Sequence, residues 1–179
     1  SLASGLVANF GTMTKSLHAG RTAQSGVLAA RLADQGFTGS LDVLEHRTGF
    51  LRAHSPSGAP NIDNGTIDIG KNWRLADLGV CVKRYPTCYA THRSIDAMLG
   101  LVSQHKLKPE DVKEIRVHTG TTQKLMLRNT NPQTGLEAKF SMEFAMASAL
   151  IAGRVSLSEL TDEFVSRPDV GATFARVHC

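Results

Sequence analysis

Residues 15–36 read KSLHAGRTAQSGVLAARLADQG, and this stretch decides how the first part of the chain folds. It is rich in alanine, contains no proline, and ends at Gly36, a residue type that commonly follows the last turn of a helix. The stretch therefore predicts a helix from Lys15 to Gln35. Its many small side chains leave little bulk on any face, which favours close packing against other helices and predicts that this helix is buried. These residues are Ala19, Gly20, Ala23, Ser25, Gly26, Ala29 and Ala30.

The second half of the chain mixes helical and extended patterns. Apolar residues at helical spacing predict a helix over 94–105, and Ser141 opens an apolar helix that reaches Ile151 and is closed by Gly153. Residues 112–117 alternate apolar and charged side chains, which predicts a half-buried strand. The pair Ser156 and Glu159 has the spacing of a capping box and predicts a helix that stops at 167–168.

The first half contains weaker signals. Residues 41–46 predict a short helix that residues 49–53 extend or follow, and the Ser, Pro, Gly, Asn and Asp residues of 55–70 predict a turn-rich loop. Val80 and Val82 then bracket a short extended segment before Pro86. The character of the sequence thus changes near residue 79, from almost entirely helical to mixed. The predicted fold class is α+β.

Composition narrows the class of protein. The 179 residues are 41% hydrophobic and 20% charged, as in an ordinary globular protein, and a chain of this length can bury about 70% of its surface without disulfides. The three cysteines are odd in number and lack the spacing of a disulfide framework, which favours a protein from a reducing compartment. No run approaches the ~20 apolar residues of a membrane span, and no signal peptide pattern is present. We therefore expect a cytoplasmic protein that does not bind membranes.

The net charge of +4 raises the question of an anionic partner. The excess is dispersed, without a block of five or six like charges, and aromatic residues make up only 6% of the chain. Nucleic-acid binding is therefore not expected, and a small anionic substrate fits better. The patterns GxGxxG, GxxxxGK[ST], GxSxG and HExxH are also missing, so nucleotide binding and the common hydrolase mechanisms have no support.

One candidate site lies at the start of the first predicted helix. His18 lies three residues after Lys15, and Arg21 or Thr22 lies six or seven residues after it, so these side chains share one helix face. Cationic groups beside the free N–H groups of a helix N-terminus suit carboxylates, and histidine exchanges a proton near neutral pH. The alternative is a solvated helix face, which these spacings alone produce more often.

A second candidate site is the segment CVKRYPTCYATH at 81–92, in which Pro86 bends the chain between Lys83 and His92. A zinc site would use Cys81, Cys88 and His92, but this spacing matches no common ligand set and lacks a fourth ligand. A catalytic thiolate at Cys88 would need His92 as its activating partner. Cysteines that act as small apolar fillers remain the more common alternative.

A third candidate is Lys139, which lies just before the helix predicted to start at Ser141. Its ammonium group would be placed there to bind an anion. The alternative is that Ser141 is simply the helix cap and Lys139 a solvated charge.

Three segments, in this order along the chain, resemble motifs of the MmgE/PrpD family. They are GTMTKSLHAGR at 11–21, VKRYP at 82–86 together with the Thr-His pair at 91–92, and EAKFSM at 137–142. The family includes 2-methylcitrate dehydratase, cis-aconitate decarboxylase and iminodisuccinate epimerase. The resemblance extends along essentially the whole chain.

The resemblance implies a large all-helical domain, a smaller α+β lid, an active site between them and a homodimer in the complete protein. Residues 1–78 would be the C-terminal part of the helical domain, and residues 79–179 part of the lid. Family members also use residues from an earlier helical segment that has no counterpart here. We therefore expect the chain to be a fragment that is catalytically incomplete by itself.

The resemblance also implies a lyase without metal or organic cofactor that acts on a small di- or tricarboxylate. Dehydration of 2-methylcitrate or a similar hydroxy acid is the first expectation, with decarboxylation or epimerisation of a related acid as the alternative. By the same resemblance Lys15 and Lys83 are catalytic, and His18 matches a motif histidine that we place with them. The expected substrate-binding residues are Arg21, Arg84, His92 and Lys139.

A hypothesis of another class is a non-catalytic module that binds a partner protein through the helix at 15–35. The two hypotheses differ in geometry: an enzyme requires Lys15 and Lys83 to face one cleft, whereas in a binding module they can diverge.

Overall fold

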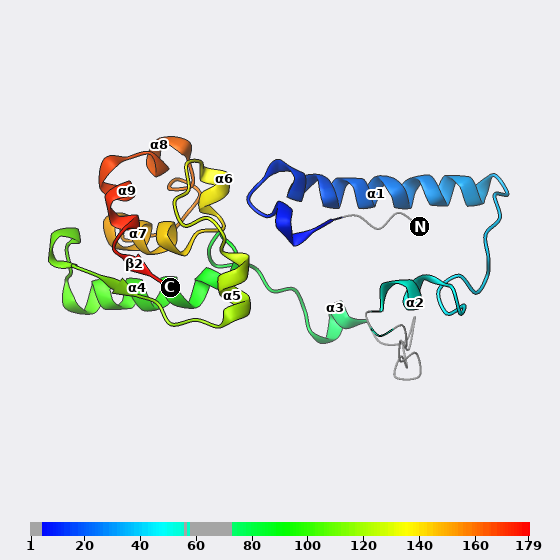
Figure 1. Cartoon of the computed structure of the whole chain (residues 1–179), viewed down its shortest axis with the longest axis horizontal. Coiled ribbons are helices and arrows are strands. Elements are labelled where there is room, and N and C mark those ends of the chain that lie inside the picture. Colours follow the sequence, from blue (N-terminus) through cyan, green and yellow to red (C-terminus); the bar gives the residue numbers. More distant parts are fainter. Residues whose placement is uncertain (1–4, 56, 58–72) are drawn as a thin grey trace. The chain divides into compact units, whose positions relative to one another are not determined.

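The structure is a computed structural model that describes residues 5–55, 57 and 73–179. The chain divides into two compact units, one made of Ser1–Thr22 with Val82–Cys179 and the other of Ala23–Cys81. Helices dominate, and a two-stranded parallel sheet accompanies them (Figure 1), which agrees with the α+β class predicted from the sequence.

Helix α7, Met142–Ala152, is the centre of the first unit. Every residue from Met142 to Leu150 is buried, as expected for a helix that is apolar all round. The hydroxyl of Ser141 accepts a hydrogen bond from the N–H of Phe144 and caps the helix start, and Gly153 ends the helix with φ 64°. Both boundaries agree with the sequence prediction.

Helices α4, His92–His105, and α9, Pro168–Phe174, both pack against α7. Figure 1 shows α4 running beside α7 in the first unit. The predicted helix at 94–105 is therefore confirmed, with its start two residues earlier. Ile95 and Met98 on α4 and Val170 on α9 are buried against the central helix. These apolar contacts form the core that supports the loops described below.

The predicted strand at 112–117 is present in shortened form as β1, Ile115–Arg116. It pairs in parallel with β2, Val177–His178, with Ile115 opposite Val177. Short 3₁₀ turns η2, Tyr89–Thr91, and η3, Pro109–Asp111, and short helices α5, Thr121–Met126, and α6, Gly135–Ala138, connect the larger elements.

The helix predicted from Ser156 to 167–168 starts later than expected, although it does end just before Arg167. Glu159 does accept hydrogen bonds from the backbone N–H and the hydroxyl of Ser156, but these close a turn. The helix that follows, α8, Asp162–Val165, starts only after Thr161, whose hydroxyl accepts from the N–H of Phe164. Pro168 then begins α9, because proline fits the first helical position, where its missing N–H costs nothing.

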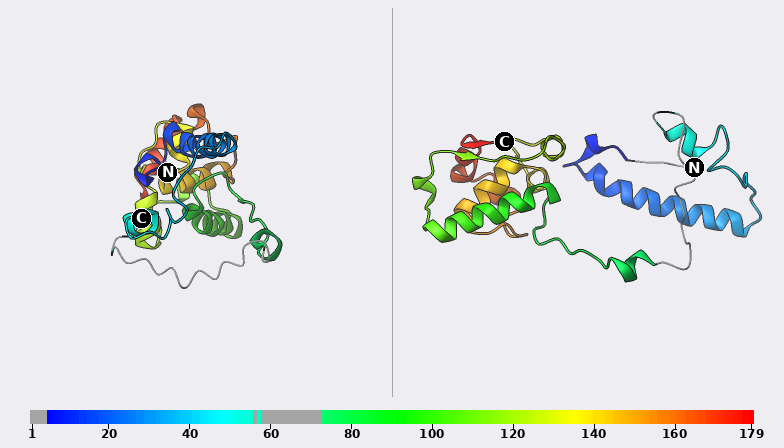
Figure 2. Two further views of the ribbon diagram at one scale, coloured as in Figure 1. Left: turned by 90° about the vertical axis from the view of Figure 1, so that its right-hand side faces the viewer. Right: turned by 90° about the horizontal axis from the view of Figure 1, so that it is seen from below.

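Helix α1, Met13–Asp34, confirms the predicted helix at 15–35 (Figure 2). The expected burial is wrong: α1 has no buried residue, and Leu17 and Val27 are 63% and 56% exposed. Its small residues carry little apolar area, and its few larger apolar side chains do not form one stripe.

The remaining elements are short. They are the 3₁₀ turn η1, Val7–Asn9, and the helices α2, Phe50–His54, and α3, Arg74–Asp77. Residues 41–45 form turns instead of the predicted helix, and residues 80–83 form no strand. Most of the loop predicted at 55–70 lies outside the described residues. Within the described part of the chain, no helix is long and apolar enough to cross a bilayer.

Candidate functional site

Lys15, in the first turns of α1, lies against two aromatic rings. Its ammonium nitrogen is 5.0 Å from the ring centroid of Phe10 and 5.7 Å from that of Phe140. The two rings themselves pack with their centroids 5.4 Å apart. A cation over aromatic faces is held by about 0.5–1 kcal/mol at an exposed site. Lys15 is therefore oriented toward the EAKFSM motif at 137–142, although its side chain is exposed.

The turn before α1 also contacts this motif. Gly11 adopts φ 84°, and a Cβ at this position would lie 2.7 Å from the Nδ2 of Asn129. Asn129 in turn donates from Nδ2 to the carbonyl of Glu137 and from its backbone N–H to the carbonyl of Phe140. The first motif therefore needs glycine at position 11 to approach the third motif this closely.

The second motif is bound to the third through the main chain. The backbone N–H of Cys88 donates to the carbonyl of Lys139 over 2.8 Å. The loop is further closed by Lys83, whose ammonium donates to the carbonyl of Thr87 over 3.0 Å. The hydroxyls of Thr87 and Thr91 are 2.9 Å apart and both residues are buried. We call residues 83–88 the Lys83 loop.

The adjacent residues Lys139 and Phe140 are therefore the point at which the three motifs meet. Lys15 contacts the ring of Phe140, and the Lys83 loop is bound to the carbonyl of Lys139. The side chain of Lys139 is itself half-buried. All of these contacts lie within the first compact unit.

Arg84 is directed at α4. One of its terminal nitrogens, Nη1, lies 2.9 Å from the Oδ1 of Asp96, and its guanidinium lies 5.5 Å from the ring centroid of Tyr85. The same carboxylate oxygen accepts a 2.6 Å hydrogen bond from the hydroxyl of Tyr85. Burial, followed by the hydrogen bond to Asp96, raises the pKa of Tyr85 above its usual value. Arg84 is thus paired with a carboxylate of the protein.

His92, at the start of α4, is 93% buried between two aromatic rings. It packs edge-on against Tyr85 at 5.3 Å and tilted against Tyr89 at 4.9 Å. Its Nε2 is buried and has no hydrogen-bond partner among the described residues. A buried ring nitrogen without a partner is costly, which makes His92 a candidate for contact with a bound ligand or water.

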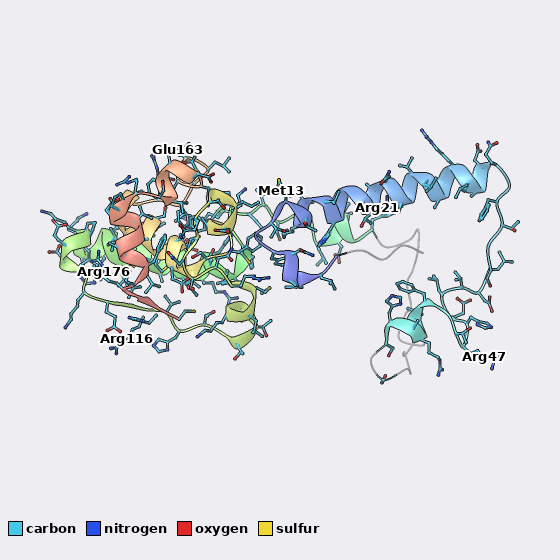
Figure 3. The ribbon with its side chains drawn as sticks, turned by 45° about the horizontal axis from the view of Figure 1, so that its top comes forward. Met13, Arg21, Arg47, Arg116, Glu163 and Arg176 are labelled. Atoms are coloured by element: carbon cyan, nitrogen blue, oxygen red, sulfur yellow. The ribbon has the colours of Figure 1, made fainter. Side chains whose placement is uncertain are left out.

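The remaining predicted site residues lie along α1. His18 is half-buried, and its ring packs against the backbone at Gly5, where a Cβ would lie 2.9 Å from its Nδ1. Arg21, labelled in Figure 3, is exposed one turn further along the same helix.

Glu143 is a buried carboxyl that the sequence analysis did not select. It lies in the first turn of α7, 7% exposed, and accepts a 3.3 Å hydrogen bond from the hydroxyl of Ser141. Burial is the largest influence and raises its pKa. The sequence carried a signal for it, because an acidic residue in an otherwise apolar helix is unusual.

Two cavities are lined by residues of α4 and of the segment 115–123. One, of about 640 Å³, is lined by polar residues that include Arg93, His118 and Gln123, and the other, of about 240 Å³, is largely apolar and shares Arg93 and His118 with it. Neither cavity is lined by a residue that the sequence analysis predicted for the site. Arg93 follows the second motif directly, and its position one residue after His92 is the signal that could have identified it.

No group of three His, Cys, Asp or Glu side chains within residues 5–55, 57 and 73–179 could hold a metal ion. The zinc set considered above is therefore not assembled. Cys81 is exposed, whereas Cys88 is half-buried, and both are free thiols.

Comparison with known proteins bears on both parts of the chain. Residues 1–63 match the model of the MmgE/PrpD N-terminal domain, and residues 85–179 match that of the MmgE/PrpD C-terminal domain. Cis-aconitate decarboxylase from Homo sapiens is 29% identical over 96% of this chain and 36% of its own length. Cis-aconitate decarboxylase from Mus musculus is 28% identical over 96% of the chain and 35% of its own length. The chain thus spans about a third of the length of these curated relatives. It belongs to the MmgE/PrpD family.

Proposed function

We propose that the protein containing this chain is a lyase that acts on a small di- or tricarboxylate and that Lys15 and Lys83 are catalytic. The observation that carries the proposal is the meeting of the three motifs at Lys139 and Phe140. Lys15 lies over Phe140, and the loop that bears Lys83 is bound to Lys139. Family membership and the names of the two relatives support a lyase.

The proposed chemistry centres on a carbon next to a carboxylate. In a decarboxylation the bond to one carboxylate carbon breaks, its electron pair stays on the neighbouring carbon, and that carbon then takes a proton. In a dehydration a base removes a proton from such a carbon, and the hydroxyl on the next carbon leaves with a proton as water. Both reactions build negative charge that cationic side chains stabilise in a closed site.

Six of the seven predicted residues divide by chemistry, and the seventh, Arg84, already pairs with Asp96. Lys15 and Lys83 would stabilise the developing charge, and His18 would exchange a proton. Arg21, His92 and Lys139 would hold the carboxylates that do not react. The buried Nε2 of His92, which has no hydrogen-bond partner in the described part of the chain, supports this role, because a carboxylate oxygen would satisfy it when the nitrogen carries the proton.

Two reactions are candidates. Dehydration of 2-methylcitrate follows from the motif resemblance, whereas the relatives' names support decarboxylation of cis-aconitate. At 29% identity the names are a guide to the substrate class. We therefore propose a small tricarboxylate as the substrate and keep both reactions, together with epimerisation of a related acid, as outcomes of the test.

The proposed assembly follows the family. Residues 1–78 would belong to a helical domain and residues 79–179 to a lid, with the active site between them in a homodimer. The exposed apolar side chains of α1, among them Leu17 and Val27, fit contact with other helices in this assembly. They fit the binding-module hypothesis equally well, so exposure of α1 does not separate the two.

The experiment is an assay of the full-length protein with cis-aconitate, 2-methylcitrate and iminodisuccinate, with products followed by proton NMR. We expect turnover of cis-aconitate or 2-methylcitrate, and turnover of iminodisuccinate alone would indicate an epimerase instead of a lyase. The proposal fails if a correctly folded protein turns over none of them, and the binding-module hypothesis then takes its place.

A further inference from the structure

We infer that Asp96 is a positioning residue: its carboxylate holds Tyr85 and Arg84, and through them the Lys83 loop, against α4. Arg84 then serves to fix the loop and does not contact the substrate, which replaces its role in the sequence prediction. The inference rests on the proposed function only in taking Lys83 as catalytic.

Tyr85 is the buried half of this arrangement. The residue is 6% exposed and belongs to the hydrophobic core, and its hydroxyl donates to the Oδ1 of Asp96 over 2.6 Å. His92 packs edge-on against the same ring. A buried hydroxyl needs a partner, and Asp96 supplies a charged one, which makes the hydrogen bond short and strong. The middle of the Lys83 loop is therefore fixed to the second turn of α4.

Arg84 is the exposed half. It approaches the same Oδ1 atom at 2.9 Å and lies over the ring of Tyr85. The side chains of Arg84 and Asp96 are 74% and 47% exposed, so their ion pair adds little to the stability of the fold. The ion pair instead fixes where Arg84 points. Because the guanidinium already contacts a carboxylate of α4, it is held on the α4 side of the loop.

Lys83 directly precedes Arg84 and points elsewhere. Its ammonium donates to the carbonyl of Thr87 in its own loop, while the end of the loop is bound through Cys88 to Lys139. If Asp96 released Arg84 and Tyr85, the loop would be anchored at its end and not at its beginning. Lys83 would then lose its fixed position, and a displacement of about 1 Å can cost about a hundredfold in rate.

The kinetic test uses the full-length enzyme with the variants Asp96→Asn, Arg84→Met and the double variant. We expect each single variant to lower kcat about ten- to a hundredfold with little change in KM, and the double variant to lose no more than either alone. Arg84→Lys should recover part of the rate. If Arg84 instead binds substrate, Arg84→Met raises KM and Asp96→Asn leaves kcat unchanged, and this result overturns the inference.

A matched control is the exposed pair Arg116 and Glu114, which lie 2.8 Å apart and have similar exposed fractions. Arg116→Met and Glu114→Gln should leave both kinetic constants unchanged. An equal loss of kcat in these variants would mean that the effect at Asp96 is not specific to the loop.

A readout without turnover separates this inference from the proposed function. Cys88 lies at the end of the loop and is half-buried, whereas Cys81 is exposed. Labelling with iodoacetamide, measured for each cysteine by peptide mass spectrometry, should be faster at Cys88 in Asp96→Asn and unchanged at Cys81. If the wild-type protein turns over no acid, the proposed function fails while this result still supports the loop restraint. Unchanged labelling of Cys88 in both Asp96→Asn and Arg84→Met overturns the restraint itself.

Discussion

The ammonium nitrogen of Lys15 lies 5.7 Å from the ring centroid of Phe140. This contact joins a helix at the start of the chain to the motif that precedes α7. Because Lys139, the neighbour of Phe140, receives the hydrogen bond of Cys88, the same short segment also holds the Lys83 loop. The chemistry that we propose depends on this segment staying in place.

Replacing Phe140 tests that dependence. We expect Phe140→Leu to lower kcat of the full-length enzyme about tenfold, because Lys15 loses an aromatic face and its orientation. Phe174→Leu is the control, since Phe174 on α9 is buried to the same 7% exposed fraction but contacts none of the three motifs in the interactions described above. Both variants should lower stability by similar amounts, measured by urea unfolding. Equal kcat in the two variants would contradict a role for Phe140 in placing Lys15.

Two glycines on different elements should respond oppositely to alanine. A Cβ at Gly135 would lie 2.1 Å from the carbonyl oxygen of Leu160, so Gly135→Ala forces the backbone apart and should cost about 1–3 kcal/mol. Gly100, inside α4, has nothing within 4 Å of such a Cβ, so Gly100→Ala should stabilise by up to about 1 kcal/mol. Urea unfolding of both variants measures the difference, and a stabilising Gly135→Ala would mean that the contact with Leu160 is wrong.

The cap of α7 should be worth a measurable free energy. Ser141 is fully buried, and its hydroxyl accepts from the N–H of Phe144 and donates to Glu143. Ser141→Ala should lower the free energy of unfolding by about 1–2 kcal/mol. Ser158→Ala, at an exposed position, should change it by less than about 0.5 kcal/mol. Equal effects at the two serines would show that Ser141 does not cap the helix.

Stability should depend on pH through Glu159, which is 2% exposed. Burial acts to raise its pKa, but hydrogen bonds from Ser156 and Arg154 outweigh burial and lower the pKa below its ordinary value of 4.5. The folded state therefore binds this proton less readily than the unfolded state. The resulting stabilisation is present above pH 4.5 and is lost as the pH falls through the folded-state pKa.

Glu159→Gln tests this dependence. The variant should be less stable than wild type at pH 7 by about 1–3 kcal/mol, because charged hydrogen bonds are lost, and the difference should shrink below pH 4.5. Urea unfolding at pH 7, 5 and 3 provides the measurement. A difference that stays constant over this range would mean that the ionised carboxylate is not the stabilising form.

Local signals explain what the sequence could predict. Helix α7 was predicted almost to the residue, because its cap Ser141 and its terminal Gly153 lie in the segment itself. The helix predicted from Ser156 starts later than expected although Glu159 does bind Ser156, because the same hydrogen bonds serve a turn equally well. Strand β2 gave no signal, because two residues show no periodicity and its partner β1 lies far away in the sequence.

The candidate site likewise has a part that the sequence could predict and a part that it could not. Motifs identified Lys15, Lys83 and Lys139, and the contacts at Phe140 bring their segments together. No local pattern indicated that Asp96, a turn into α4, takes Arg84 as its partner, because this pairing depends on how the loop folds back. The burial of His92 between Tyr85 and Tyr89 was likewise a consequence of that fold.

Turnover by lysine variants of the full-length enzyme tests the central claim most directly. The substrate is whichever of cis-aconitate, 2-methylcitrate and iminodisuccinate the wild type converts. Lys83→Met and Lys15→Met keep most of the side-chain volume and remove the charge, whereas Lys113→Met removes an exposed lysine outside the three motifs. We predict that kcat falls by about a hundredfold or more in the first two variants and is unchanged in the third. Near-normal turnover by a correctly folded Lys83→Met enzyme would contradict the account.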